Sequence, residues 1–169
     1  VALSPALALM TRLQHLNLST NHMHDEGLVS LGPALAGLTR LETLDLKRNK
    51  LSSAGVPALF GFLTNARLLR EIDLAGNVTH YSFQSSDGPD MMAKLTPYII
   101  KLPSLQKISV ASNFLFSLGV KHLASIVVES FGSLTSVDLG GTRAAGNKIG
   151  SAGAKSLAAA LFHTPLKEL

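Results

Sequence analysis

The sequence has no cysteine and no tryptophan, and only 15% of its 169 residues are charged. Without cysteine there is no disulfide framework, no thiol nucleophile and no cysteine-ligated zinc, haem or iron–sulfur site. The 15 basic and 11 acidic residues are scattered and give a net charge of only +4, which argues against binding to nucleic acid. No apolar run reaches the roughly 18–20 residues that span a bilayer, and the apolar start, 1–10, lacks the basic residues of a secretion signal. We therefore expect no membrane association and an intracellular, cytoplasmic protein.

Leucine is abundant instead, with 31 copies, and its positions repeat. Segments of the form L-x-x-L-x-L-x-x-N-x-apolar begin at residues 13, 41, 69, 105 and 134, and a sixth begins at 166. The spacings between these starts are 28, 28, 36, 29 and 32 residues. Between the segments, apolar residues recur at helical spacing, as at Leu28, Leu31, Leu35 and Leu38. Each repeat is therefore expected to consist of a short strand followed by a helix.

These segments resemble the leucine-rich repeat family, in its ribonuclease-inhibitor-like class with 28–29 residues in a repeat. The resemblance implies an α/β fold, a curved solenoid with a parallel β-sheet on its concave face and helices on its convex face. It divides residues 1–169 into the helix of a preceding repeat (1–12), five repeats (13–40, 41–68, 69–104, 105–133 and 134–165) and the start of a sixth (166–169). Neither end carries the polar cap that a solenoid end requires, so we expect a fragment of a larger protein.

Each repeat carries an asparagine where the chain is expected to leave its strand. These residues are Asn21, Asn49, Asn77, Asn113 and Asn147. An amide side chain there can bond backbone groups that burial would otherwise leave unpaired, and the resemblance implies a ladder of asparagines between repeats. In four repeats a glycine follows six residues later, and we expect it to open the helix where a side chain would obstruct the chain.

Polar residues alternate with the leucines of each expected strand and should face outward on the concave side. They are polar and varied in the early repeats and mostly small in the later ones, and the charged ones of the second and third repeats are the candidate partner-binding residues. These are Asp45, Lys47, Arg48, Glu71 and Asp73. Asp45 and Asp73 are expected neighbours, and paired carboxylates could serve acid–base chemistry or meet a basic partner. A solvated, purely structural position is the favoured interpretation, because a shallow sheet rarely offers a catalytic pocket.

Two repeats are longer than the others, within 78–87 and within 140–146. Insertions in solenoids form loops along one rim. Tyr81 and Phe83 in the first insertion, and Arg143 in the second, are of types favoured in protein interfaces, so we also count them as partner-binding candidates. The alternative is that Phe83 fills the core of its widened repeat and that Arg143 is solvated.

No other motif indicates catalysis. The cluster His22, His24, Asp25 and Glu26 looks like a metal site. However, the loop is short, no third histidine is nearby in the sequence, and zinc requires three or four ligands that converge on one point. Neither a phosphate-binding loop nor a nucleophile with a histidine at motif spacing occurs. We predict no metal, no cofactor and no enzymatic activity, and assign the chain as a protein–protein interaction or scaffold module that binds another protein by its concave face and rim.

Two other functions stay open. The resemblance extends to Ran GTPase-activating proteins, in which an arginine on a rim loop bears on GTP hydrolysis by a small GTPase, and Arg143 lies on the corresponding kind of loop. Against this, the chain lacks the long acidic tail of those proteins, and its repeats match them no better than they match others. The segment could also belong to a NOD-like receptor, or to a cytoskeletal or flagellar assembly. No local motif identifies the partner.

Overall fold

Five short parallel strands form one sheet in the order in which they occur along the chain. The computed structural model describes residues 3–78, 86–130, 133–142, 146–162, 164 and 166–169. The strands are β1 (His15–Asn17), β2 (Thr43–Asp45), β3 (Glu71–Asp73), β4 (Lys107–Ser109) and β5 (Ser136–Asp138). Each strand is only three residues long. Each repeat contributes one short strand, and the sheet is extended by adding the strands of successive repeats side by side.

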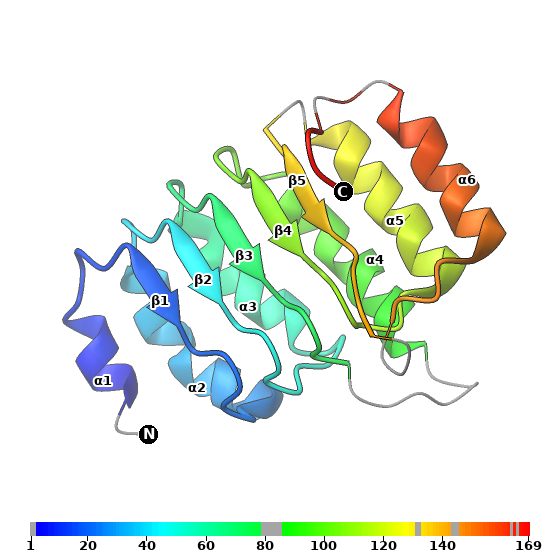
Figure 1. The fold of residues 1–169 in the computed structure, drawn as a ribbon. Helices are drawn as coiled ribbons and strands as arrows, with labels where there is room; N and C mark the ends of the chain where they lie inside the picture. Colours follow the sequence, from blue (N-terminus) through cyan, green and yellow to red (C-terminus); the bar gives the residue numbers. More distant parts are fainter. Residues whose placement is uncertain (1–2, 79–85, 131–132, 143–145, 163, 165) are drawn as a thin grey trace.

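A helix connects each strand to the next and covers one face of the sheet. The helices are α1 (Leu3–Ala8), α2 (His24–Gly37), α3 (Val56–Phe62, continued by the 3₁₀ helix η1, Leu63–Asn65), α4 (Asp87–Ile99), α5 (Phe116–Glu129) and α6 (Gly150–Leu161). Figure 1 shows the strands side by side along a gentle curve, with α2 to α6 stacked behind them. The predicted α/β solenoid is confirmed.

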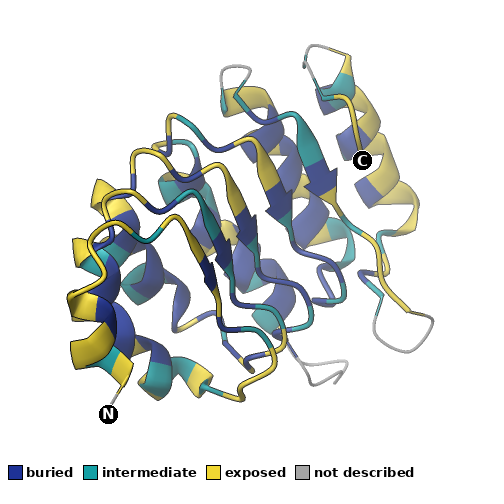
Figure 2. Ribbon diagram, turned by 60° about the vertical axis from the view of Figure 1, so that its left-hand side comes forward, coloured by how far each residue is buried: buried dark blue, intermediate teal, exposed yellow. Residues whose placement is uncertain are grey.

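One continuous core lies between the sheet and the helices (Figure 2). The middle residue of every strand points into it, and all five are buried: Leu16, Leu44, Ile72, Ile108 and Val137. No single repeat could bury such a face alone, because its leucines are covered by those of its neighbours. The strand pairing sets the residues flanking these positions in columns, with Asn17 beside Asp45 and Asp45 beside Asp73, which confirms the predicted register.

A ladder of asparagines follows the sheet where each strand ends. The Oδ1 atom of Asn77 accepts hydrogen bonds from the N–H groups of Asn49 (2.9 Å) and Leu51 (3.2 Å). Its Nδ2 group donates to the carbonyl oxygens of Leu46 (3.1 Å) and Leu74 (2.8 Å). The same pattern recurs at Asn49, Asn113 and Asn147, all buried, so each amide links its own repeat to the preceding one.

Asn21 occupies the first position of this ladder and differs from the rest. Its side chain is exposed and donates only within its own repeat, to the carbonyl oxygens of Leu18 (2.9 Å) and Ser19 (3.1 Å). Its backbone N–H still donates to Asn49 Oδ1 at 3.1 Å. Its side chain therefore binds no second repeat, and water can reach the groups around it.

The backbone beside the ladder adopts left-handed conformations at residues whose type does not predict them. Among the described residues, nine other than glycine have a positive φ, including Arg48 (53°) and Lys50 (58°) on either side of Asn49. A side chain in this region costs roughly 1–2 kcal/mol, and glycine usually relieves the cost. Glycine occurs at equivalent positions only as Gly76 and Gly150, so the ladder bonds hold most of these turns against local preference.

The helices begin earlier than predicted. Three of the four recurring glycines lie in the first turn of a helix rather than ahead of it, as Gly119 does in α5 and Gly153 in α6. Space is short there within and between repeats. A Cβ atom on Gly153 would lie 2.9 Å from Ile149 Cγ2 and 3.2 Å from Ser117 Cα, and one on Gly119 would lie 2.9 Å from Leu115 Cβ and 3.3 Å from Pro89 Cα. Glycine thus lets the first turns of adjacent helices approach closely. Only Gly55 precedes its helix, at the N-cap of α3.

Replacing Asn77 with alanine should destabilise the solenoid far more than replacing Asn21. In Asn77→Ala the N–H groups of Asn49 and Leu51 lose their acceptor in the buried interior, whereas the Leu46 and Leu74 carbonyls keep the amides of Asn49 and Asn113 as donors. Two buried unpaired N–H groups should cost about 3 kcal/mol or more, and the exposed Asn21→Ala about 1 kcal/mol or less. Urea unfolding followed by circular dichroism measures both, and equal losses would contradict a ladder that bears on stability.

Candidate functional site

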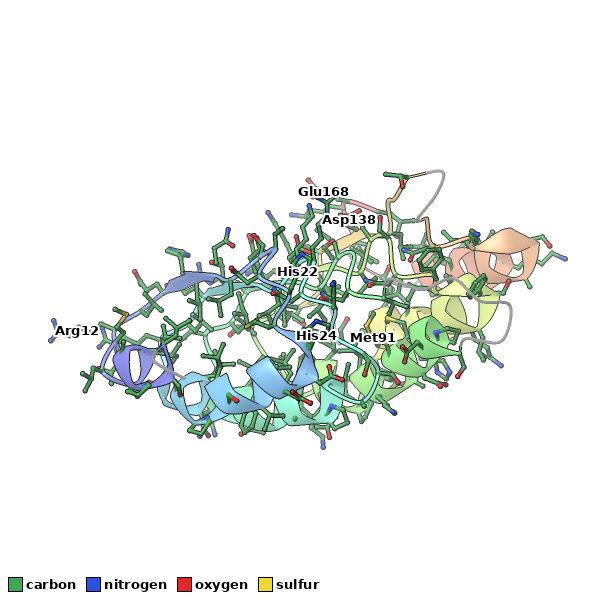
Figure 3. All side chains as sticks on the ribbon, turned by 90° about the horizontal axis from the view of Figure 1, so that it is seen from below. Arg12, His22, His24, Met91, Asp138 and Glu168 are labelled. Atoms are coloured by element: carbon green, nitrogen blue, oxygen red, sulfur yellow. The ribbon has the colours of Figure 1, made fainter. Side chains whose placement is uncertain are left out.

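The outward face of the sheet carries a row of acidic side chains that we call the acidic strip: Asp45, Glu71, Asp73 and Asp138. The strip lies along an open hollow of about 450 Å³ that crosses all five strands. Figure 3, in which the sheet lies above the helices, shows Asp138 on this face. The structure thus brings together three of the sequence-predicted residues, Asp45, Glu71 and Asp73, on two adjacent strands.

The aspartates of the strip also end their strands. Asp45 Oδ1 accepts the N–H of Lys47 at 2.9 Å, Asp73 Oδ1 accepts that of Ala75 at 2.8 Å, and Asp138 Oδ1 accepts that of Gly140 at 2.8 Å. Asn17 makes the same bond to Ser19, so the position needs an acceptor oxygen but no charge. This turn bond gives the structural interpretation of Asp45 and Asp73 a physical basis.

Burial raises the pKa of the Asp73 carboxyl above its ordinary value of 3.8, and the adjacent Asp45 carboxylate adds to the rise. The Ala75 N–H and the Lys47 ammonium act in the opposite direction. Lys107 pairs with Glu71 at 3.3 Å, but both side chains are about half exposed, and such a pair contributes little. At the middle of the strip, partial burial together with the neighbouring Asp45 carboxylate thus disfavours the charged form of Asp73.

A second hollow, the rim groove, follows the line where the chain leaves the strands. It has a volume of about 490 Å³. It is lined by His22, Lys47, Arg48, Lys50, Ala75, Gly76, Val78, Ala111, Ser112, Phe114, Asp138 and Thr142. Backbone bonds continue the strand pairing into it, from Arg48 N–H to the Ala75 carbonyl and from Gly76 N–H to the Ala111 carbonyl, both near 2.9 Å. Lys47 and Arg48, predicted from the sequence, therefore line this groove beside the acidic strip.

Tyr81, Phe83 and Arg143 lie outside the described residues. Val78 and Thr142 are the last described residues before 79–85 and 143–145, and both line the rim groove.

The histidine cluster is divided between different surroundings. Asp25 accepts hydrogen bonds from the N–H and the hydroxyl of Ser52 and so binds the next repeat. His22 lines the rim groove, whereas His24 lines a smaller hollow with Ser52 and Asp87. Figure 3 shows His22 toward the strands and His24 nearer the helices. Within the described part of the chain no group of three or more His, Asp or Glu could hold a metal ion.

The sequence reasoning missed His22 and Lys50 as members of the site. Both follow a ladder asparagine directly, and both have a left-handed backbone (φ 50° and 58°). The signal was present in the repeat: Asn49 turns inward, and Arg48 and Lys50 on its two sides are exposed. Extending the columns five positions past each strand, from Asn17 to His22 and from Asp45 to Lys50, would have grouped these residues with Arg48.

Comparisons with known proteins agree with this geometry. Two family models described as leucine-rich repeat match residues 10–32 and 40–63. Twenty-four solved chains match, among them the tropomodulin C-terminal domain of Caenorhabditis elegans, with a TM-score of 0.67 and 16% sequence identity over 95% of this chain and 92% of that one. No curated protein sequence matches significantly. Among the described residues, no helix is long and apolar enough to cross a membrane.

The chain is a leucine-rich repeat protein. The evidence is the strand order of its repeats, the asparagine ladder between them and the two matching family models. The predicted subclass, the ribonuclease-inhibitor-like one, stays a prediction. So does the alternative function that depends on Arg143, since that residue is not among those described.

Neutralising Asp73 should stabilise the protein at neutral pH. An acid whose pKa is higher in the folded than in the unfolded chain loses stability as pH rises from the unfolded value through the folded one. Asp73→Asn removes that charge and keeps the oxygen that accepts the Ala75 N–H, as Asn17 does in the first repeat. We expect a higher Tm for Asp73→Asn than for the unmodified chain at pH 7, and equal Tm values below about pH 3.8.

Asp73→Ala is the matched control for this prediction, because it removes the charge and the turn bond together. It should lower the Tm relative to Asp73→Asn at every pH. A difference between Asp73→Asn and the unmodified chain that does not vary with pH would contradict the electrostatic explanation.

Proposed function

We propose that the protein is a non-enzymatic module that binds a partner protein with its concave face. The observation that carries this proposal is the open, polar sheet face, whose side chains are held in fixed columns by strand pairing and by the ladder. Outward side chains that are already ordered lose little conformational entropy on binding, which favours affinity. Asp45, Lys47, Arg48, Glu71 and Asp73 are the proposed contact residues.

The charge pattern supports a partner of mixed charge. The acidic strip presents three carboxylates on β2 and β3, and the rim groove presents cations a few residues further along the same repeats. Charge patterns of this kind set the orientation and the choice of partner more than they set raw affinity. Basic side chains of the partner would lie over the strip, because Asp73 gains most from a positive neighbour.

The two insertions belong to the same proposal. Val78 and Thr142, which fall within the two insertion ranges, line the rim groove, so a partner seated there would contact part of each range. Tyr81, Phe83 and Arg143 are thus proposed to extend the contact. A triple variant, Tyr81→Ser, Phe83→Ser and Arg143→Ala, examines their part separately from that of the strip.

Partner capture from cell extract should depend on the acidic strip. The test variant is Glu71→Gln with Asp73→Asn, which removes two charges while keeping hydrogen-bond acceptors. The matched control is Glu26→Gln with Glu129→Gln, which removes two exposed charges from α2 and α5 on the helical side. We expect the affinity of a purified captured partner, measured by calorimetry, to fall about tenfold or more in the strip variant and to stay unchanged in the control.

Two results would contradict the proposal. One is a partner whose affinity is the same for the unmodified chain, the strip variant and the insertion variant. The other is an equal loss in the strip variant and the helical control, which would indicate a nonspecific response to net charge. Thermal melts of each variant ensure that only folded protein is compared.

A further inference from the structure

The rim groove joins a charged wall to a floor of small residues. Its wall at the β1 and β2 end consists of His22, Lys47, Arg48 and Lys50. Its floor, beyond β3 and β4, consists of Ala75, Gly76, Val78, Ala111 and Ser112. In the columns of Lys47 and Arg48, the third and fourth repeats carry small residues, Ala75 with Ala111 and Gly76 with Ser112, which leaves room for the hollow.

We propose that this groove binds an acidic segment of a partner protein, with carboxylates at Arg48 and Lys50 and an apolar side chain over the small-residue floor. This inference rests on the proposed function and names the chemistry of one part of the partner. Along its length, from the first two repeats to the third and fourth, the lining of the groove changes from cationic to apolar. The bound segment should therefore carry acidic residues followed, in one direction along its sequence, by an apolar residue.

The cations are available for such a ligand. The two ion pairs found in the described part of the chain are Arg70 with Glu42 and Lys107 with Glu71, and neither involves Arg48 or Lys50. Both side chains are exposed and flank Asn49, which is fully buried. Because the chain turns Asn49 inward, its two neighbours turn toward solvent on the same rim.

The Arg48 side chain also extends toward the groove floor. Its Cγ atom lies over Gly76, at a distance where a Cβ atom on that glycine would approach to 3.1 Å. The stem of Arg48 therefore lies across the next repeat, toward the floor of the groove. A guanidinium placed there can bind a carboxylate through two parallel hydrogen bonds.

The floor suits an apolar side chain from the ligand. Ala75, Val78 and Ala111 are buried hydrophobic residues that form the bottom of the hollow without filling it. Covering them with an apolar group removes further surface from water, which favours binding. At the far end, the Asp138 carboxylate accepts hydrogen bonds from Ser109 Oγ and the Gly140 N–H, and it limits the reach of an acidic chain.

The surroundings favour a protein ligand over a nucleic acid. The acidic strip adjoins the groove. Asp45 lies two residues before Lys47, and Asp73 is close enough to Lys47 for the ammonium charge to lower the pKa of the Asp73 carboxyl. A polyphosphate chain would extend past the few cations and meet these carboxylates, whereas an acidic peptide can end or change charge there. The short basic stretch therefore matches a local cluster of carboxylates.

Fluorescence anisotropy with short labelled peptides tests the proposal. The probe is a peptide of four glutamates followed by phenylalanine, and its comparison peptide has glutamine in place of glutamate. The groove variant is Arg48→Glu with Lys50→Glu. The matched control is Lys121→Glu with Lys155→Glu, which makes the same change of charge on the exposed surface of α5 and α6.

We expect the glutamate peptide to bind the unmodified chain at least about tenfold more tightly than the glutamine peptide, and to lose at least that factor in the groove variant. The control should bind within about twofold of the unmodified chain, and added salt should weaken binding in both. Thermal melts show whether each variant is folded.

Three outcomes would overturn the proposal: no preference for glutamate over glutamine, an equal loss in the groove variant and the control, or a single-stranded oligonucleotide that binds as tightly and through the same two residues. The strip variant of the previous section separates this result from the wider function. Suppose that the glutamate peptide binds the groove, but that partner affinity is the same for the unmodified chain, the strip variant and the insertion variant. The proposed function then fails and the groove assignment stands. If capture depends on the strip while the peptide does not bind, only the groove assignment fails.

Discussion

Hydrogen bonding by the buried asparagines is the constraint on which the remaining structure depends. Where each strand ends, the chain must turn toward its helix while still inside the protein, and its N–H groups would lie there without partners. One amide supplies an acceptor to two N–H groups of the preceding repeat and a donor to two carbonyls. The left-handed turns, the outward direction of Arg48 and Lys50, and the straight columns of the sheet all follow from this arrangement.

The repeat pattern was enough to predict strands, register and core. Leucine spacing identifies the buried residues, because in a strand the neighbours of Leu44 must face the other way. The conformation of the turns could not be predicted in the same manner. Glycine marks a left-handed residue at Gly76, but Arg48 adopts the same conformation with a side chain that disfavours it. Contacts from the next repeat decide this, and no local sequence carries them.

The candidate site was predictable in part for the same reason. Asp45, Glu71 and Asp73 follow directly from strand alternation and lie where expected. His22 and Lys50 lie beyond the strands, where the direction of a side chain depends on the turn rather than on alternation, and they were missed. The start of the helices was misjudged because Gly119 and Gly153 lie inside the first turn, where neighbouring atoms leave no room for a side chain. Features that the leucine spacing determines were thus predictable, whereas turn conformations and close packing around the helix starts were not.

The ladder has a direction as well as a pattern. The Oδ1 atoms of Asn77 and Asn113 accept hydrogen bonds from the repeat that comes before them in the chain, and their Nδ2 groups donate to that same repeat. A ribosome delivers the repeats in that same order, and protein domains commonly fold from the N-terminal side during synthesis. Each newly emerged asparagine therefore meets partners that are already in place, and the solenoid can lengthen by one repeat at a time as the chain is made.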